Sequence, residues 1–179
     1  MKYLLSLAHG IDWINERLGR VAVWAVLIAC LVSAGNATVR YALDMSSNAW
    51  VELQWYLFAV TVMFGAAWVL KVNEHVRVDV IYGSRSGTTK AWIDLLGLIF
   101  FLMPATLLMV WMSWGWVVDA YVTHELSSNA GGLVRWPVKA TIPVGFFFLS
   151  LQGLSEIIKR IGFLSGRHAM DTHYERPLQ

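Results

Sequence analysis

Two polar side chains close together, Glu52 and Gln54, are the first candidates for chemistry in this sequence. Acid–base catalysis by a pair of side chains needs both groups on one face, but residues two positions apart do not share a helix face. An acid near the start of a helix is favoured by the helix dipole. Two interpretations of Glu52 follow: a carboxylate that stabilises the start of its own helix, or a buried polar contact with another subunit.

A second polar string contains His75, Arg77 and Asp79, with valines between them. A metal centre needs several convergent ligands, and too few lie here. The alternation instead predicts a solvated turn in which Arg77 and Asp79 contact a neighbouring chain or lipid head groups. The pair His124-Glu125 begins the zinc-protease signature His-Glu-x-x-His, but position 128 is serine. We therefore predict no metal site, no cofactor and no enzymatic activity.

The elements that carry these residues follow from composition. Hydrophobic residues make up 57% and charged residues 15% of the 179 residues, against about 45–50% and about 25% in soluble domains. Four blocks of 16 to 24 residues contain no charged residue, and a membrane-spanning helix needs roughly 20 residues, within a range of about 17–25. The sequence therefore predicts an all-α membrane protein with four transmembrane helices. The predicted spans are about 18–40, 50–70, 91–119 and 138–159, preceded by an interfacial helix over 1–17.

These spans form one predicted domain, residues 1–165, followed by a polar cytoplasmic tail over 166–179. Pro104 is the expected site of a bend in the long third span. Lys139 and Glu156 border the short fourth span, and we expect both side chains to reach outward to the lipid head groups.

Basic residues set the predicted orientation, because cytoplasmic loops of membrane proteins are enriched in lysine and arginine. With the N-terminus inside, eleven of the 14 basic residues fall in cytoplasmic segments and three in outer segments. Both termini are therefore predicted to be cytoplasmic. The net charge of +2 does not indicate binding of nucleic acid, and the single cysteine excludes an internal disulfide.

The uncharged blocks also limit the function. Ion-coupled transporters place ionisable groups within the membrane, and these blocks contain no Asp, Glu, Lys, Arg or His. All five histidines lie outside the blocks, so no facing pair is available to ligate a haem. An anchor for a redox enzyme and a small homo-oligomeric transporter remain as alternatives. Small residues at every fourth position of the first span predict a helix-packing face: Ala25, Ala29, Ser33 and Ala37.

Together, these features resemble the small membrane subunit, the DctQ-like component, of the tripartite ATP-independent periplasmic (TRAP) transporters. The likeness combines four spans, both ends inside, and an acid at the start of the second span. The residues that carry it further are Gly65-Ala66-Ala67, His75-x-Arg77-x-Asp79 and the strings at 128–137 and 154–160.

The resemblance implies a bacterial inner-membrane protein that binds a large multi-span subunit, with a periplasmic substrate-binding protein and membrane lipid as further partners. It implies sodium-driven uptake of organic anions such as carboxylates, with the substrate and ion sites in the large subunit. The small subunit would be non-catalytic and would stabilise the scaffold of the large one. The implied partner-contact residues are Glu52, Gln54, His75, Arg77 and Asp79, with Arg135 and Trp136 on the outer side.

Overall fold

The computed structural model describes residues 1–73 and 85–169. No strand occurs in these two ranges, in which Leu126 and Val134 form an isolated β-bridge. Four helical rods within them are long and apolar enough to cross a membrane, which confirms the predicted all-α membrane fold. The elements in chain order are α1 (Lys2–Leu43), α2 (Asn48–Val72), α4 (Gly87–Gly97), the π-helical segment η1 (Leu98–Leu102), α5 (Met103–Val122) and α6 (Trp136–Leu164).

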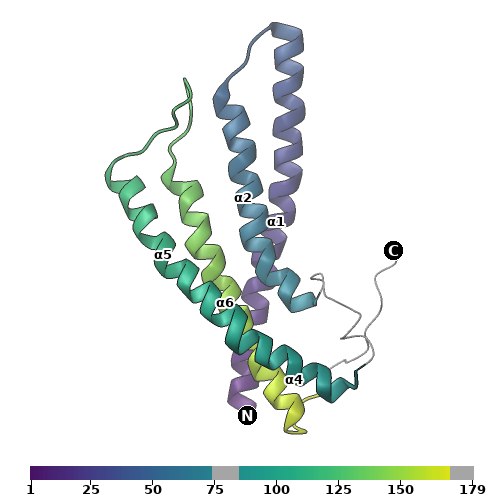
Figure 1. Ribbon diagram of the computed structural model, residues 1–179. Coiled ribbons are helices and arrows are strands. Elements are labelled where there is room, and N and C mark those ends of the chain that lie inside the picture. Colours follow the sequence, from purple (N-terminus) through teal and green to yellow (C-terminus); the bar gives the residue numbers. More distant parts are fainter. Residues whose placement is uncertain (74–84, 170–179) are drawn as a thin grey trace.

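Helix α6 is the centre of the bundle. α1 and α2 form one antiparallel hairpin, and α5 and α6 form a second beside it (Figure 1). Half of the most apolar stretch of α6 is buried inside the chain, against 6% of the corresponding stretch of α2. Because α6 contacts α1, α2, α4 and α5, it provides the surface on which the other helices are positioned.

Helix α1 is continuous, so the predicted N-terminal interfacial segment runs into the first span without a break (Figure 1). Its buried positions recur every three or four residues, which places them on one face of the helix. They are Ala8, Ile11, Asn15, Gly19, Ala22 and Ala25. Small side chains dominate this face, and they allow neighbouring helices to approach closely.

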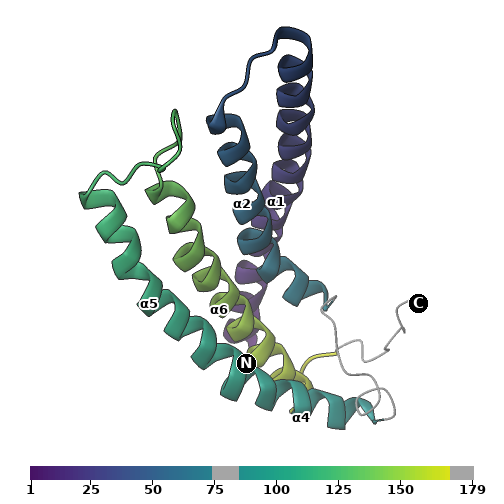
Figure 2. The same cartoon turned by 45° about the horizontal axis from the view of Figure 1, so that its top comes forward.

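The third rod bends where an α-helical turn widens into a π-helical one. The Met103 N–H donates to the Leu98 carbonyl, and Pro104 follows at once in the first turn of α5. Proline has no N–H and its ring crowds the carbonyl four residues earlier, so a wider turn accommodates it. Figure 2 shows α4 and α5 running in different directions on either side of this segment. The predicted bend at Pro104 is confirmed.

Short connections close the helix ends. α1 ends at Asp44, which adopts a left-handed φ of 53°. The hydroxyl of Ser47 then caps α2 by accepting a hydrogen bond from the Ala49 N–H (3.3 Å). So short a connection makes α1 and α2 antiparallel neighbours. α4 begins in the same way, with the Ser86 hydroxyl accepting from the Thr89 N–H (3.4 Å).

Two glycines set the spacing between α2 and its neighbours. A Cβ at Gly145 of α6 would lie 2.6 Å from the Met63 Cβ and 2.9 Å from the Met63 carbonyl oxygen. A Cβ at Gly19 of α1 would lie 2.7 Å from Cγ of Trp68. Only glycine leaves the room for these approaches without a shift of the neighbouring helix.

We expect Gly145→Leu to force α2 and α6 apart and to destabilise the bundle by about 1–3 kcal/mol, because the added side chain overpacks a closed contact. The measurement is thermal unfolding of the purified chain in mild detergent, followed by tryptophan fluorescence. Gly115→Leu is the matched control, since nothing lies within 4 Å of a Cβ at that position. Equal unfolding midpoints for wild type and Gly145→Leu would contradict the close approach.

Candidate functional site

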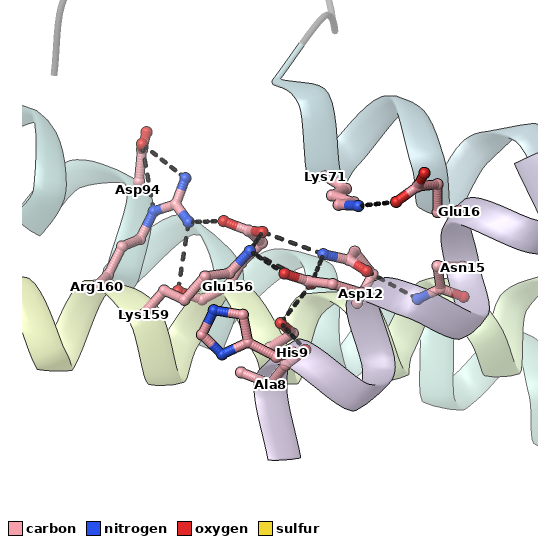
Figure 3. A network of polar contacts seen from close by, with 12 residues as sticks. Ala8, His9, Asp12, Asn15, Glu16, Lys71, Asp94, Glu156, Lys159 and Arg160 are labelled. Atoms are coloured by element: carbon pink, nitrogen blue, oxygen red, sulfur yellow. Dashed lines mark hydrogen bonds and ion pairs between the residues drawn. The ribbon is translucent and has the colours of Figure 1, made fainter. Parts of the chain in front are cut away.

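A dense set of polar contacts joins the N-terminal part of α1, α4 and the C-terminal part of α6 (Figure 3). The Lys159 ammonium donates to Asp12 Oδ2 on α1 (3.1 Å) and to Glu156 on α6. The side chains of these three residues are at most 15% exposed. We call the whole set the ion-pair network. Its members are Asp12, Asn15, Asp94, Gln152, Ser155, Glu156, Lys159 and Arg160.

Arg160 extends the ion-pair network from α6 to α4. Its Nε and Nη2 donate to Asp94 Oδ2, at 3.3 and 3.1 Å, and its Nη1 donates to Glu156. Only 6% of the Arg160 side chain and 8% of the Glu156 side chain are exposed. Ions buried to this degree require such partners, because an unpaired charge in apolar surroundings is strongly unfavourable.

Uncharged side chains join α1 to α6 within the same network (Figure 3). Asn15 Nδ2 donates to Gln152 Oε1 (2.8 Å). Gln152 Nε2 donates in turn to Asp12 Oδ1 (2.9 Å) and Glu156 Oε1 (3.1 Å), and the Ser155 hydroxyl donates to Asp12 Oδ1 (2.7 Å). Asn15 and Gln152 have no exposed surface. Their hydrogen bond therefore joins α1 to α6 in the interior of the bundle, in addition to the Asp12–Lys159 ion pair.

The ion-pair network was not predicted from the sequence. Its α6 members stand at positions 152, 155, 156, 159 and 160, a spacing of three and four residues that places them on one helical face. That spacing is visible in the string Gln-x-x-Ser-Glu-x-x-Lys-Arg and is the signal that could have revealed the network. The partners are not visible there, since Lys159 and Asp12 are 147 positions apart.

Two charged residues expected at the lipid head groups are buried instead, so that prediction is wrong. Glu156 is 6% exposed and Lys139 is 7% exposed. Glu156 belongs to the ion-pair network, while Lys139 pairs with Glu125 and lies 4.2 Å from the centroid of the Trp116 ring. Because each has an oppositely charged partner within the chain, neither needs to reach the head groups.

At the other end of the bundle, Glu52 holds the loop between α5 and α6 against the start of α2. Its Oε1 accepts hydrogen bonds from Asn129 Nδ2 (2.8 Å) and the Ser127 hydroxyl, and its Oε2 accepts from the Leu133 N–H (2.7 Å). Glu52 is only 4% exposed. Both carboxylate oxygens are therefore engaged within the chain, in contacts that the sequence analysis did not foresee.

Two more hydrogen bonds fasten this loop, residues 123–135, to α2. The Tyr56 hydroxyl donates to the Val134 carbonyl (2.9 Å), and Asn48 Nδ2 donates to the Ala130 carbonyl (3.0 Å). A Cβ at Gly132 would lie 2.9 Å from Glu52 Oε1, so glycine there leaves room for the carboxylate. These hydrogen bonds hold the 123–135 loop against the N-terminal part of α2.

The other predicted partner-contact residues are spread over the chain. Gln54 and Arg135 are half-buried. Trp136 is 39% exposed, and its ring packs edge-to-face on Tyr121 with 5.5 Å between centroids. Outside the described residues lie three of the predicted contacts: His75, Arg77 and Asp79.

The predicted helix-packing series on α1 is only partly covered by the chain's own helices. Ala25 is buried and Ala29 half-buried, whereas Ser33 and Ala37 are exposed. An α-helix has 3.6 residues per turn, so a strict four-residue series drifts around the helix away from the buried face. The second half of the series therefore faces out of the bundle.

The charged residues of the ion-pair network and Glu52 beside the 123–135 loop suit a structural role. Among residues 1–73 and 85–169, no group of three or more His, Cys, Asp or Glu side chains could hold a metal ion. In the ion-pair network acids alternate with bases, so each base lies between two acids, and these contacts fix the relative positions of α1, α4 and α6. The arrangement can hold helices in register at both ends of the bundle.

Comparison with known protein families agrees with a membrane role. Residues 29–162, more than half of the chain, match the family of tripartite ATP-independent periplasmic transporters, DctQ component. The matched range runs from within α1 almost to the end of α6. No curated protein and no solved structure matches the chain. The match is to a transporter component and gives no support to a redox-enzyme anchor.

We expect Arg160→Gln to lower the free energy of unfolding by about 3–5 kcal/mol, because it leaves the buried carboxylates Asp94 and Glu156 with one cation fewer. The measurement is unfolding in mixed micelles titrated with sodium dodecyl sulfate, followed by circular dichroism. Arg40→Gln, at an exposed arginine near the far end of α1, is the control and should change the free energy by less than about 0.5 kcal/mol. A similar small effect for Arg160→Gln would contradict the role of the network.

We expect Glu52→Gln to loosen the 123–135 loop, because the amide nitrogen cannot accept the hydrogen bond from the Leu133 N–H. A hydrogen bond to a charged group contributes about 1.5–3 kcal/mol, so the Leu133 amide should exchange its hydrogen roughly 10- to 100-fold faster. Hydrogen–deuterium exchange with mass spectrometry on loop peptides measures this rate. Asp119→Asn, at an exposed acid on α5, should leave it unchanged. Unaltered exchange in Glu52→Gln would show that Glu52 does not hold the loop.

Proposed function

The chain belongs to the DctQ component family of the tripartite ATP-independent periplasmic transporters, and on that basis we propose that it is a non-catalytic support for a large transport subunit. DctQ subunits are small proteins of the bacterial inner membrane, and the four span-capable helices fit that location. The family works with a large membrane subunit and a periplasmic binding protein. In our proposal this chain keeps the scaffold of the large subunit in place while transport proceeds there.

The observation that carries the proposal is the pairing of the buried charges. The buried charged side chains of the described residues are Glu52, Lys139, Glu156 and Arg160, and each has partners within the chain. A transport site within the membrane needs polar groups that remain available to the transported species. Satisfied charges instead favour a fixed bundle, so the proposal assigns the substrate and coupling-ion sites to the large subunit.

We further propose that the complete transporter takes up organic anions, carboxylates in particular, with the sodium gradient as driving force. The support for this step is the resemblance to TRAP transporters as a class. The chain itself contributes no group to the chemistry of the substrate in this proposal. Its contribution is mechanical, through the helices that α6 holds together.

The proposed orientation has both termini in the cytoplasm, with residues 1–165 as one membrane domain and 166–179 as its tail. The distribution of lysine and arginine supports this orientation. The ion-pair network then lies at the cytoplasmic end of the bundle, and the 123–135 loop lies at the periplasmic end. Each end of the support is thus fixed by its own set of polar contacts.

The proposed contacts with the large subunit divide by position. Ser33 and Ala37, which the chain's own helices leave exposed, would pack against a helix of the large subunit, since small residues favour close helix contacts in lipid. Glu52 would act through the 123–135 loop that it holds. The remaining contacts in the proposal are Gln54, Arg135 and Trp136 at the periplasmic end, and His75, Arg77 and Asp79 at the cytoplasmic end.

We expect the double variant Ser33→Leu, Ala37→Leu to reduce recovery of the large subunit by at least about fivefold, because overpacking a helix contact costs roughly 1–3 kcal/mol. The measurement is affinity purification of the tagged chain from native membranes in mild detergent, with quantitative mass spectrometry of the partners. Ala105→Leu is the matched control, since it enlarges an exposed small residue on another helix.

The two outcomes of this purification bear on different claims. Wild-type chain recovered without a large multi-span partner, even after cross-linking in the membrane, would overturn the proposed function. Full recovery of that partner with Ser33→Leu, Ala37→Leu would overturn only the assignment of this face of α1. Unfolding of the double variant alone should match that of wild type, because both positions are exposed in the chain.

A further inference from the structure

The face of α1 that points away from the bundle changes from charged to uncharged over a short distance. Trp13, Arg17, Arg20 and Trp24 lie on this face, at spacings of four, three and four residues, and all four are exposed. No charged residue follows Arg20 until Arg40. Because tryptophan and arginine gather where a helix passes from head groups into hydrocarbon, this stretch marks the membrane boundary on α1.

The guanidinium of Arg17 is available at this boundary. It lies over the Trp13 ring, 4.2 Å from the centroid. Within the described parts of the chain it forms no hydrogen bond or ion pair. A guanidinium that stacks on an aromatic face keeps its N–H donors at its edge, where they can bind two oxygens of one phosphate or carboxylate.

The neighbouring charges leave the surface positive. Arg20 Nη2 lies 3.3 Å from Glu16 Oε1, and Lys71 Nζ of α2 lies 2.9 Å from Glu16 Oε2 (Figure 3 shows the second contact). Arg20 and Lys71 thus share the single carboxylate of Glu16, and Arg17 adds a third positive charge beside them. Arg20 is also mostly exposed, with 63% of its side chain accessible. The surface can therefore attract an anion to the level of the head groups.

We propose that Arg17 and Arg20, with Trp13 as a platform, bind the phosphate of an anionic phospholipid head group. Charge complementarity supports this occupant, because basic side chains at a membrane boundary bind anionic lipids. The apolar continuation of the same face distinguishes a lipid from free phosphate: Trp24 and Leu31, each 63% exposed, extend from the arginines toward the hydrocarbon. Acyl chains can lie along these side chains while the phosphate binds the guanidinium groups.

The test is a titration of the purified full-length chain in mild detergent with phosphatidylglycerol or phosphatidylcholine, read as lipid adducts by native mass spectrometry. Wild type should bind phosphatidylglycerol more tightly than phosphatidylcholine. Arg17→Gln and Arg20→Gln should each weaken binding of phosphatidylglycerol roughly fivefold, and together roughly 25-fold, as expected from about one such factor per basic residue. Arg40→Gln, at the other end of the same helix, is the control and should bind as wild type does.

Three results would overturn the proposal. The first is unchanged binding of phosphatidylglycerol in the Arg17→Gln, Arg20→Gln variant, and the second is an equal loss in Arg40→Gln. The third is displacement of the lipid by millimolar inorganic phosphate, which would indicate a site for free anions. The charge-preserving variant Arg17→Lys, Arg20→Lys should keep the preference for phosphatidylglycerol, and because both positions are exposed, the glutamine variant should keep the circular dichroism spectrum of wild type.

Discussion

An ionised side chain inside an apolar bundle needs a partner of opposite charge or several hydrogen-bond donors, and this requirement shapes both ends of the protein. At one end, Lys159 and Arg160 of α6, whose side chains are at most 15% exposed, meet acids on α1 and α4. At the other, Glu52 is buried because three donors of the 123–135 loop converge on its carboxylate. Between the two ends the helices need only apolar and small residues, which lipid and close packing both favour.

The spans could be predicted from the sequence because charged side chains are unfavourable in hydrocarbon. Long blocks without charged residues therefore mark the segments that can cross the membrane. The ion-pair network could not, because Asp12 and Lys159 meet only through the arrangement of the folded helices. Without a known partner, Lys139 and Glu156 at the borders of a span suggest contact with head groups. Lys139 instead pairs with Glu125 of the 123–135 loop, and Glu156 pairs with Lys159 and Arg160 of its own helix. The small-residue series on α1 meets the chain's own helices only at Ala25 and Ala29, and what covers Ser33 and Ala37 stays a prediction.

The central position of α6 connects the fold with the proposed role. A support for a moving partner must not itself change shape, and each of its neighbours contacts α6 along a buried face. Glycines at 19 and 145 bring α2 close to α1 and α6, while the polar contacts at the two ends limit sliding of the helices along one another. The outer surfaces of α1 and α5 stay apolar and exposed, as suits contact with lipid or with another membrane subunit.

The order of synthesis gives the central helix a further consequence. A chain emerges from the ribosome N-terminus first, so α1, α2, α4 and α5 enter the membrane before α6 exists. Until then Asp12 and Asp94 lack the cations that α6 provides. The nascent chain therefore lacks the Asp12–Lys159 and Asp94–Arg160 ion pairs, and the last helix to be made supplies both cations at once.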